Sequence, residues 1–111
     1  MAILSANYSN LDYEAMAGAI GLKAKHIPML IGSFTGEAEG IMTNLKTAID
    51  ASDFKEIQMQ AHSIKGSAGN LKFNEVYEMA KEMELAATEP NTTFDYNAYY
   101  NAINEAISTI K

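Results

Sequence analysis

Apolar residues recur at every third or fourth position in four long stretches of the chain, and this spacing restricts the fold more than any other feature. An α-helix has about 3.6 residues per turn, so the spacing places apolar side chains on one face of each helix. The stretches run over about residues 28–51, 53–71, 73–88 and 92–110. No strand-like alternation of useful length occurs. We therefore predict an all-α protein, an antiparallel up-down four-helix bundle with an additional short N-terminal helix.

Each stretch contributes a set of residues that we expect to face the core. The first two sets are Ile27, Ile31, Phe34, Ala38, Ile41, Leu45 and Ala48, and Phe54, Ile57, Ala61, Ile64, Ala68 and Leu71. The last two sets are Val76, Tyr77, Ala80, Met83 and Ala87, and Tyr96, Tyr99, Ile103, Ala106, Ile107 and Ile110. Four such faces can enclose a single core.

The short N-terminal helix is predicted from residues that favour helix ends. Asn10 or Asp12 can cap its first turn, because a side-chain oxygen there accepts a hydrogen bond from a free backbone N–H. The helix then spans Leu11–Ile20 and ends at Gly21, which can adopt a positive φ without steric cost.

Similar signals mark the starts of the longer helices. Pro28 suits the first turn of a helix, where its missing N–H costs nothing. Asp53, followed three residues later by Glu56, is typical of a capping box. In the last stretch Thr92 or Thr93 is the expected cap.

Length and composition limit the kinds of protein that this chain can be. Residues 10–111 are expected to form one domain and residues 1–9 a flexible arm, and the absence of cysteine excludes disulfides and thiolate metal sites. The formal net charge of −6 disfavours nucleic acid and anionic membranes as partners. No apolar run reaches the roughly 18 residues of a membrane helix, and no secretory signal is visible, so we expect a soluble cytoplasmic protein.

The third predicted helix carries an unusual histidine on its outer side. His62 points roughly 130° away from the centre of the apolar face, and Lys55, Gln58, Lys65, Gly66 and Gly69 lie within about 60° of it. A neutral imidazole can act as a nucleophile near neutral pH, and Lys65, one turn away, can hold negative charge that arrives on it. Each glycine costs roughly 1 kcal/mol inside a helix, so close approach of a partner is a good reason for two of them.

Residue chemistry alone leaves a second interpretation of this surface open. His62 could be an ordinary surface histidine, with Gly66 and Gly69 loosening the end of the helix. A metal site is not indicated, because His26 is the only other histidine and stands just before Pro28. The sequence has no glycine-rich loop of the kind that binds phosphates, and no catalytic pair of carboxylates can be identified among its fourteen scattered acidic residues.

The segment His62-Ser63-Ile64-Lys65-Gly66-Ser67-Ala68-Gly69-Asn70-Leu71 resembles the signature of histidine-containing phosphotransfer (HPt) domains. That family has a histidine, any residue, an aliphatic residue and then Lys-Gly-Ser or Lys-Gly-Ala. The sequence departs from the pattern at Lys72, where the family usually has glycine. If this position needs a positive φ, either Lys72 is strained or Asn70 makes the turn.

The resemblance implies a phosphorelay intermediate that lacks an ATP-binding module and is not an enzyme. His62 would take a phosphoryl group from an aspartyl phosphate of one receiver domain and pass it to another, with Lys65 offsetting charge and Ser67 adding a hydrogen bond. Members of the family often have Gln or Glu 22 residues after the histidine, which is Glu84 here. Glu84 would fix the imidazole tautomer; the alternative is a rim charge paired with Lys81 or solvent. No cofactor is expected, because the receiver would supply Mg²⁺.

The partners that the resemblance implies are response-regulator receiver domains or a hybrid histidine kinase, and we expect the chain itself to be a monomer. A receiver would dock around His62, on a surface that we expect to include Met16, Ile20, Gln58, Met59, Gly66 and Gly69. Two other functions stay open. One is a helical adaptor without phosphotransfer, and the other is the dimerising phosphoacceptor part of a histidine kinase, which usually has an acid where Ser63 stands.

Overall fold

The computed structural model describes residues 4–110, which contain five α-helices, one short 3-10 helix and no strand. The predicted all-α class is therefore confirmed. In chain order the elements are α1 (Tyr13–Ile20), η1 (Ala24–His26), α2 (Ile27–Asp50), α3 (Phe54–Asn70), α4 (Asn74–Thr88) and α5 (Tyr96–Ser108). None of the described helices has the length and hydropathy needed to cross a membrane.

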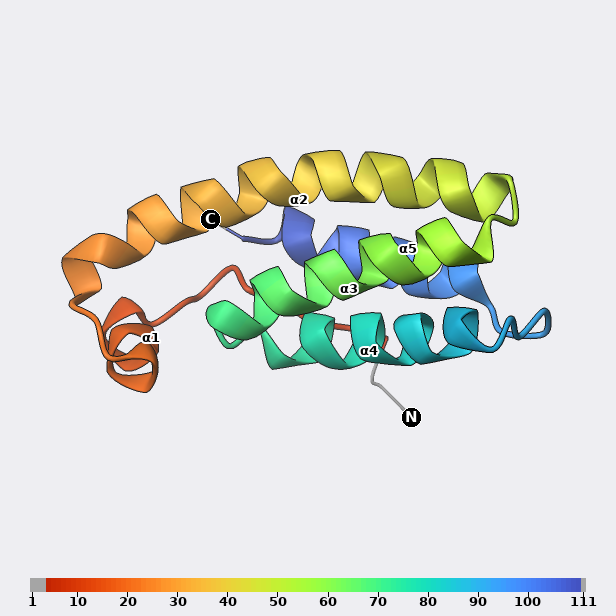
Figure 1. The fold of residues 1–111 in the computed structure, drawn as a ribbon. Helices are drawn as coiled ribbons and strands as arrows, with labels where there is room; N and C mark the ends of the chain where they lie inside the picture. The colour runs from red at the N-terminus through yellow and green to blue at the C-terminus, as the bar shows by residue number, and fades with distance from the viewer. Residues whose placement is uncertain (1–3, 111) are drawn as a thin grey trace.

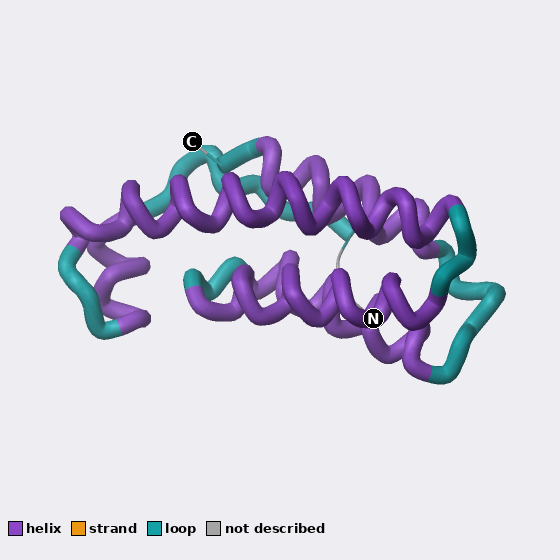
Figure 2. Tube along the Cα trace, turned by 45° about the horizontal axis from the view of Figure 1, so that its top comes forward, coloured by secondary structure: helices purple, strands orange, loops and turns teal. Residues whose placement is uncertain are grey.

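The four longer helices lie side by side and form the body of the molecule. Helix α3 packs against α2 and α4, while α5 packs against α4 and α2, so the four helices surround one core. Figure 1 shows that successive helices run back and forth along the long axis, with α1 at one end beneath the start of α2. Figure 2 shows the connecting loops gathered at the two ends of the helices.

The core is apolar and is built from the predicted faces with small shifts. On α2, Ile41 is half-buried and the neighbouring Met42 is buried in its place. On α4, Tyr77 is half-buried whereas Met79 is fully buried. The buried face of α4 is wider than one stripe because α3 and α5 cover the helix from two sides.

Aspartates cap three of the helices. Asp12 accepts a hydrogen bond from the Ala15 N–H of α1 at 3.1 Å, and Asp53 accepts one from the Glu56 N–H of α3 at 3.2 Å. The first helix thus begins two residues later than predicted, at Tyr13. The N–H of Asp53 bonds to the Ala48 carbonyl at 2.9 Å, so it is already engaged and Glu56 need not complete a capping box.

The predicted start of the last helix is wrong. Helix α5 begins at Tyr96 and its cap is Asp95, whose carboxylate accepts a hydrogen bond from the Ala98 N–H at 2.9 Å. Thr93 does not cap the helix, and its N–H and its hydroxyl both donate to the Asn91 side chain in the preceding turn, at 3.0 and 2.8 Å. This local turn delays the helix by two residues beyond the expected cap.

The segment before α1 is held to the bundle at Tyr8. Residues 1–3 of the predicted flexible arm lie outside the described residues. The Tyr8 N–H donates to the Thr109 hydroxyl and its own hydroxyl donates to Glu75, both at 2.8 Å. Its buried ring lies 4.5 Å from the Phe73 ring, centroid to centroid. At Tyr8 the segment is therefore packed and not loose, because one side chain finds both an aromatic neighbour and a polar partner.

Helix α3 ends in a tight turn that forces Lys72 into a left-handed conformation, with φ at +61°. The Phe73 N–H bonds to the Ala68 carbonyl at 3.0 Å and the Lys72 N–H to the Gly69 carbonyl at 3.1 Å. These are the two hydrogen bonds of a Schellman motif, whose left-handed position favours glycine. Of the two alternatives that the sequence left open, the turn is made at Lys72 and not at Asn70.

Candidate functional site

The side chain of His62 projects from the outer surface of α3, where 67% of it is exposed. Its neighbours Ala61 and Ile64 are fully buried on the opposite side of the same helix. The helix is thus anchored through one face and presents the imidazole on the other, as the spacing of its apolar residues predicts.

A carboxylate on the neighbouring helix binds the imidazole. Nδ1 of His62 lies 2.8 Å from Oε2 of Glu84 on α4. The other oxygen of the same carboxylate, Oε1, lies 2.7 Å from Nζ of Lys65. The structure therefore brings Lys65, Glu84 and His62 into one connected chain. It does not pair Glu84 with Lys81 among its described ion pairs.

These contacts keep the carboxylate and the ammonium charged. Partial burial favours the neutral form of Glu84, but hydrogen bonds from Lys65 and His62 outweigh it and hold the pKa of this carboxyl below its usual range. The hydrogen bond to Glu84 raises the pKa of the Lys65 ammonium in turn. An ionised carboxylate can only accept hydrogen bonds, so Nδ1 must carry the proton of this contact, and in the neutral imidazole Nε2 is then the ring nitrogen with a lone pair.

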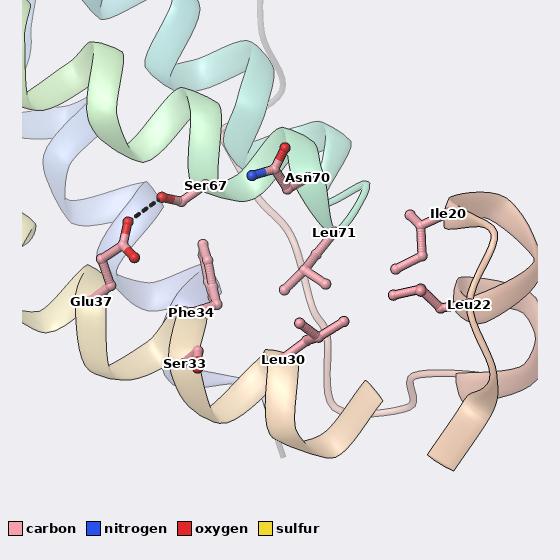
Figure 3. Close-up of a pocket in the computed structure, with 9 residues that line it drawn as sticks. All are labelled: Ile20, Leu22, Leu30, Ser33, Phe34, Glu37, Ser67, Asn70 and Leu71. Carbon is pink, nitrogen blue, oxygen red and sulfur yellow. Dashed lines mark hydrogen bonds between the residues drawn. The ribbon is translucent and has the colours of Figure 1, made fainter. Parts of the chain in front are cut away.

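Ser67 is on a different side of α3. Its hydroxyl donates to Oε1 of Glu37 on α2 at 2.6 Å (Figure 3). The structure thus does not bring this hydroxyl to the imidazole. Glu37 was not identified from the sequence, because a contact between residues 30 positions apart on two helices has no signature in the spacing of either helix.

The two glycines beside His62 have different surroundings. A Cβ atom added at Gly66 would meet nothing within 4 Å, so the protein itself gives no packing reason for glycine there. A Cβ atom at Gly69 would lie 3.2 Å from the Tyr77 side chain of α4. Gly69 therefore allows the close packing of α3 on α4, and of these two glycines Gly66 is the one with an open Cβ position.

The residues expected to dock a partner fall into two groups. Gln58 and Met59 lie beside His62, and Met59 is 51% exposed. Met16 and Ile20 are half-buried and pack against the core from α1. Ile20 lines a separate cavity of about 380 Å³ at the other end of α3, where Figure 3 shows it near Leu71. The structure does not join the two groups into one cavity.

A family model described as the Hpt domain matches residues 29–110, most of the chain. The chain therefore belongs to the HPt domain family, whose members are histidine phosphotransfer intermediates of phosphorelays in two-component signalling. Helix α1 lies outside the matched residues. Neither a curated protein nor a solved structure matches the chain.

Proposed function

We propose that His62 is the phosphoacceptor, and that it takes a phosphoryl group from the aspartyl phosphate of one receiver domain and passes it to the aspartate of another. The observation that supports this assignment is the contact between Nδ1 of His62 and the Glu84 carboxylate. It fixes the tautomer in which Nε2 is unprotonated, and only an unprotonated nitrogen can attack phosphorus.

The proposed transfer step uses the lone pair of Nε2. The Nε2 lone pair attacks phosphorus in line, an N–P bond forms, and the P–O bond to the aspartyl group breaks. The leaving carboxylate keeps the bonding electron pair. The proton on Nδ1 stays in its hydrogen bond, so the ring gains positive charge, which the Glu84 carboxylate offsets. The reverse sequence delivers the phosphoryl group to the next receiver.

Lys65 acts in this scheme through Glu84. Its ammonium is bound to the carboxylate at 2.7 Å, so it orients Glu84 and keeps it ionised, and any direct effect on the phosphoryl oxygens is secondary to this contact. Because Lys65 acts through Glu84, Lys65→Ala should slow transfer by no more than loss of the Glu84 charge does, about ten- to a hundredfold. Lys65→Arg, which keeps the charge, should recover most of the rate.

Gly66 fits a surface on which a receiver approaches closely. It is exposed, its Cβ position is open, and it gives up roughly 1 kcal/mol of helix stability relative to alanine without an internal reason. We infer that a docked receiver covers Gly66 together with Gln58 and Met59. Met16 and Ile20 would belong to the outer part of this interface, which would need to bury about 800 Å² of each partner.

The remaining parts of the proposal concern the setting of the protein. We infer that the chain is a cytoplasmic monomer, that its helices form an antiparallel up-down bundle, and that receivers or a hybrid histidine kinase are its partners. The Mg²⁺ ion needed for transfer would be held by the receiver, and the chain would make no phosphohistidine from ATP by itself.

The test is label transfer from a purified receiver that carries a radiolabelled aspartyl phosphate. Wild-type chain should acquire acid-labile, base-stable label, and His62→Gln should acquire none while its circular dichroism spectrum stays helical. Label on His62→Gln would contradict the assignment. A wild type that is never labelled by the receivers of its source would favour a helical adaptor.

A further inference from the structure

A cavity of about 520 Å³ opens beside His62 on the side facing the start of α3. Its lining residues are Lys55, Gln58, Met59, Gln60, His62, Ser63 and Glu84. Lys65 and Gly66, which follow His62 in the helix, are not among them. Side chains of an α-helix lean toward its N-terminus, so the imidazole leans toward this cavity and away from Gly66.

The polar groups of the cavity differ in whether they are already engaged. The Gln60 amide donates to Glu56 at 2.7 Å, and the Ser63 hydroxyl donates to the Met59 carbonyl at 3.1 Å. Glu84 is bound by His62 and by Lys65. Within residues 4–110 no ion pair or side-chain hydrogen bond engages Lys55 or Gln58. The cavity thus has one uncommitted ammonium and one uncommitted amide.

We propose that this cavity holds the phosphoryl group of phosphorylated His62, with Lys55 and Gln58 as the donors to its oxygens. The inference rests on the function proposed above. Gln58 lies one turn before His62, about 6 Å along the helix axis, and Lys55 lies two turns before it, about 11 Å away. A leaning imidazole with a phosphoryl group on Nε2 and an extended lysine side chain together span that distance.

Charge favours Lys55 over Lys65 for this role. A phosphoryl group on nitrogen carries close to two negative charges and three acceptor oxygens. The ammonium of Lys65 faces the Glu84 carboxylate, so its charge is largely offset where it stands. The ammonium of Lys55 is exposed and has no carboxylate partner in the described part of the chain, so it can turn to the phosphoryl oxygens as a point charge.

The test measures how the phosphoryl group partitions between a phosphorylated receiver and the chain at equilibrium. Lys55→Ala should lower the phosphorylated fraction of the chain, relative to receiver, by about three- to tenfold, as expected for loss of one partly exposed charge-assisted hydrogen bond. Gln58→Glu should lower it further, because it places a carboxylate against the phosphoryl dianion. Lys81→Ala is the matched control, since Lys81 is an exposed lysine on α4 that does not line the cavity.

A second measurement separates the role of Lys55 from the role of Lys65 and Glu84, which fix the tautomer of the His62 ring. The ¹⁵N shifts of the unphosphorylated His62 ring should change in Lys65→Ala and stay as in wild type in Lys55→Ala. The inference would be overturned if the phosphoryl group partitions to Lys55→Ala as it does to Lys81→Ala. It would also be overturned if Lys55→Ala alters the ring shifts as Lys65→Ala does. Either result would leave His62 as the phosphoacceptor. A wild type that takes no phosphoryl group would overturn both proposals.

Discussion

Replacing Lys72 by glycine should stabilise the protein, because Lys72 occupies the left-handed position of the turn that ends α3. Its φ is +61°, and both hydrogen bonds of the Schellman motif close around it, from the Lys72 and Phe73 N–H groups. Glycine adopts this conformation without the steric conflict between Cβ and the backbone that other residues meet. Lys72 itself is exposed, so the substitution removes little packing.

The size of the effect follows from two opposing contributions. The left-handed conformation costs a residue with a Cβ atom about 1–2 kcal/mol. Glycine also has more conformational freedom in the unfolded chain, which reduces this gain by about 0.4–1 kcal/mol. Lys72→Gly should therefore raise the free energy of unfolding by roughly 0.5–1 kcal/mol, and Tm by roughly 2–6 °C.

Urea unfolding followed by circular dichroism measures this difference directly. Lys72→Ala is the matched control, because it removes the same charge but keeps Cβ, and it should give no comparable gain. Ser52→Gly is a second test of the same kind, since Ser52 has a φ of +52° after α2. Equal stabilisation by Lys72→Ala and Lys72→Gly would show that charge and not backbone strain limits stability here.

Four further predictions concern the site and the helix that carries it. Glu84→Gln should slow phosphoryl acceptance by about ten- to a hundredfold, because an amide cannot offset the ring charge; equal rates would contradict the mechanism. Because the pKa of Glu84 is lowered, the stability that its carboxylate contributes is present above the ordinary glutamate pKa of about 4.3 and is lost as pH falls below that value. The urea midpoints of wild type and Glu84→Gln should therefore converge at low pH. A difference that stays constant with pH would contradict this contribution. Gly66→Ala should stabilise the helix by roughly 1 kcal/mol, while Gly66→Gln blocks receiver binding measured by calorimetry; undiminished binding would exclude a receiver covering Gly66. Gly69→Val should destabilise the bundle, because its side chain meets Tyr77, and an unchanged urea midpoint would refute this.

Much of this fold could be predicted from the sequence because the information is local. The apolar spacing that defines α3 also fixes the outward direction of His62, so its exposure follows from the helical period alone. Asp12, Asp53 and Gly21 mark helix ends because each acts on the backbone next to it. The all-α class depends on the same local spacing.

The features that escaped prediction depend on competition between neighbours or on contacts across the bundle. Thr93 has the side chain of a helix cap, but in the structure it is hydrogen-bonded to Asn91, and Asp95 caps the helix instead. Tyr8 becomes anchored only because the folded bundle brings Glu75 and Thr109 together beside it.

The pairing of Lys65 with Glu84 is of the same kind. The helical period places Lys65 near His62 and the family resemblance places Glu84 there, but neither shows that the ammonium faces the carboxylate. The role expected for Lys65 therefore changes from a direct contact with phosphoryl oxygens to the positioning of Glu84. Its function in transfer stays a prediction that Lys65→Ala tests.

The central claim, that Nε2 of His62 is the phosphoacceptor because Glu84 holds Nδ1, is tested most directly by identifying the phosphorylated nitrogen. The chain, labelled with ¹⁵N in histidine, is phosphorylated by a receiver and its imidazole nitrogens are observed by NMR. We predict ³¹P coupling to Nε2 of His62 alone, with Nδ1 still protonated, and no such signal in His62→Gln. Phosphorus on Nδ1, or on His26, would contradict the account.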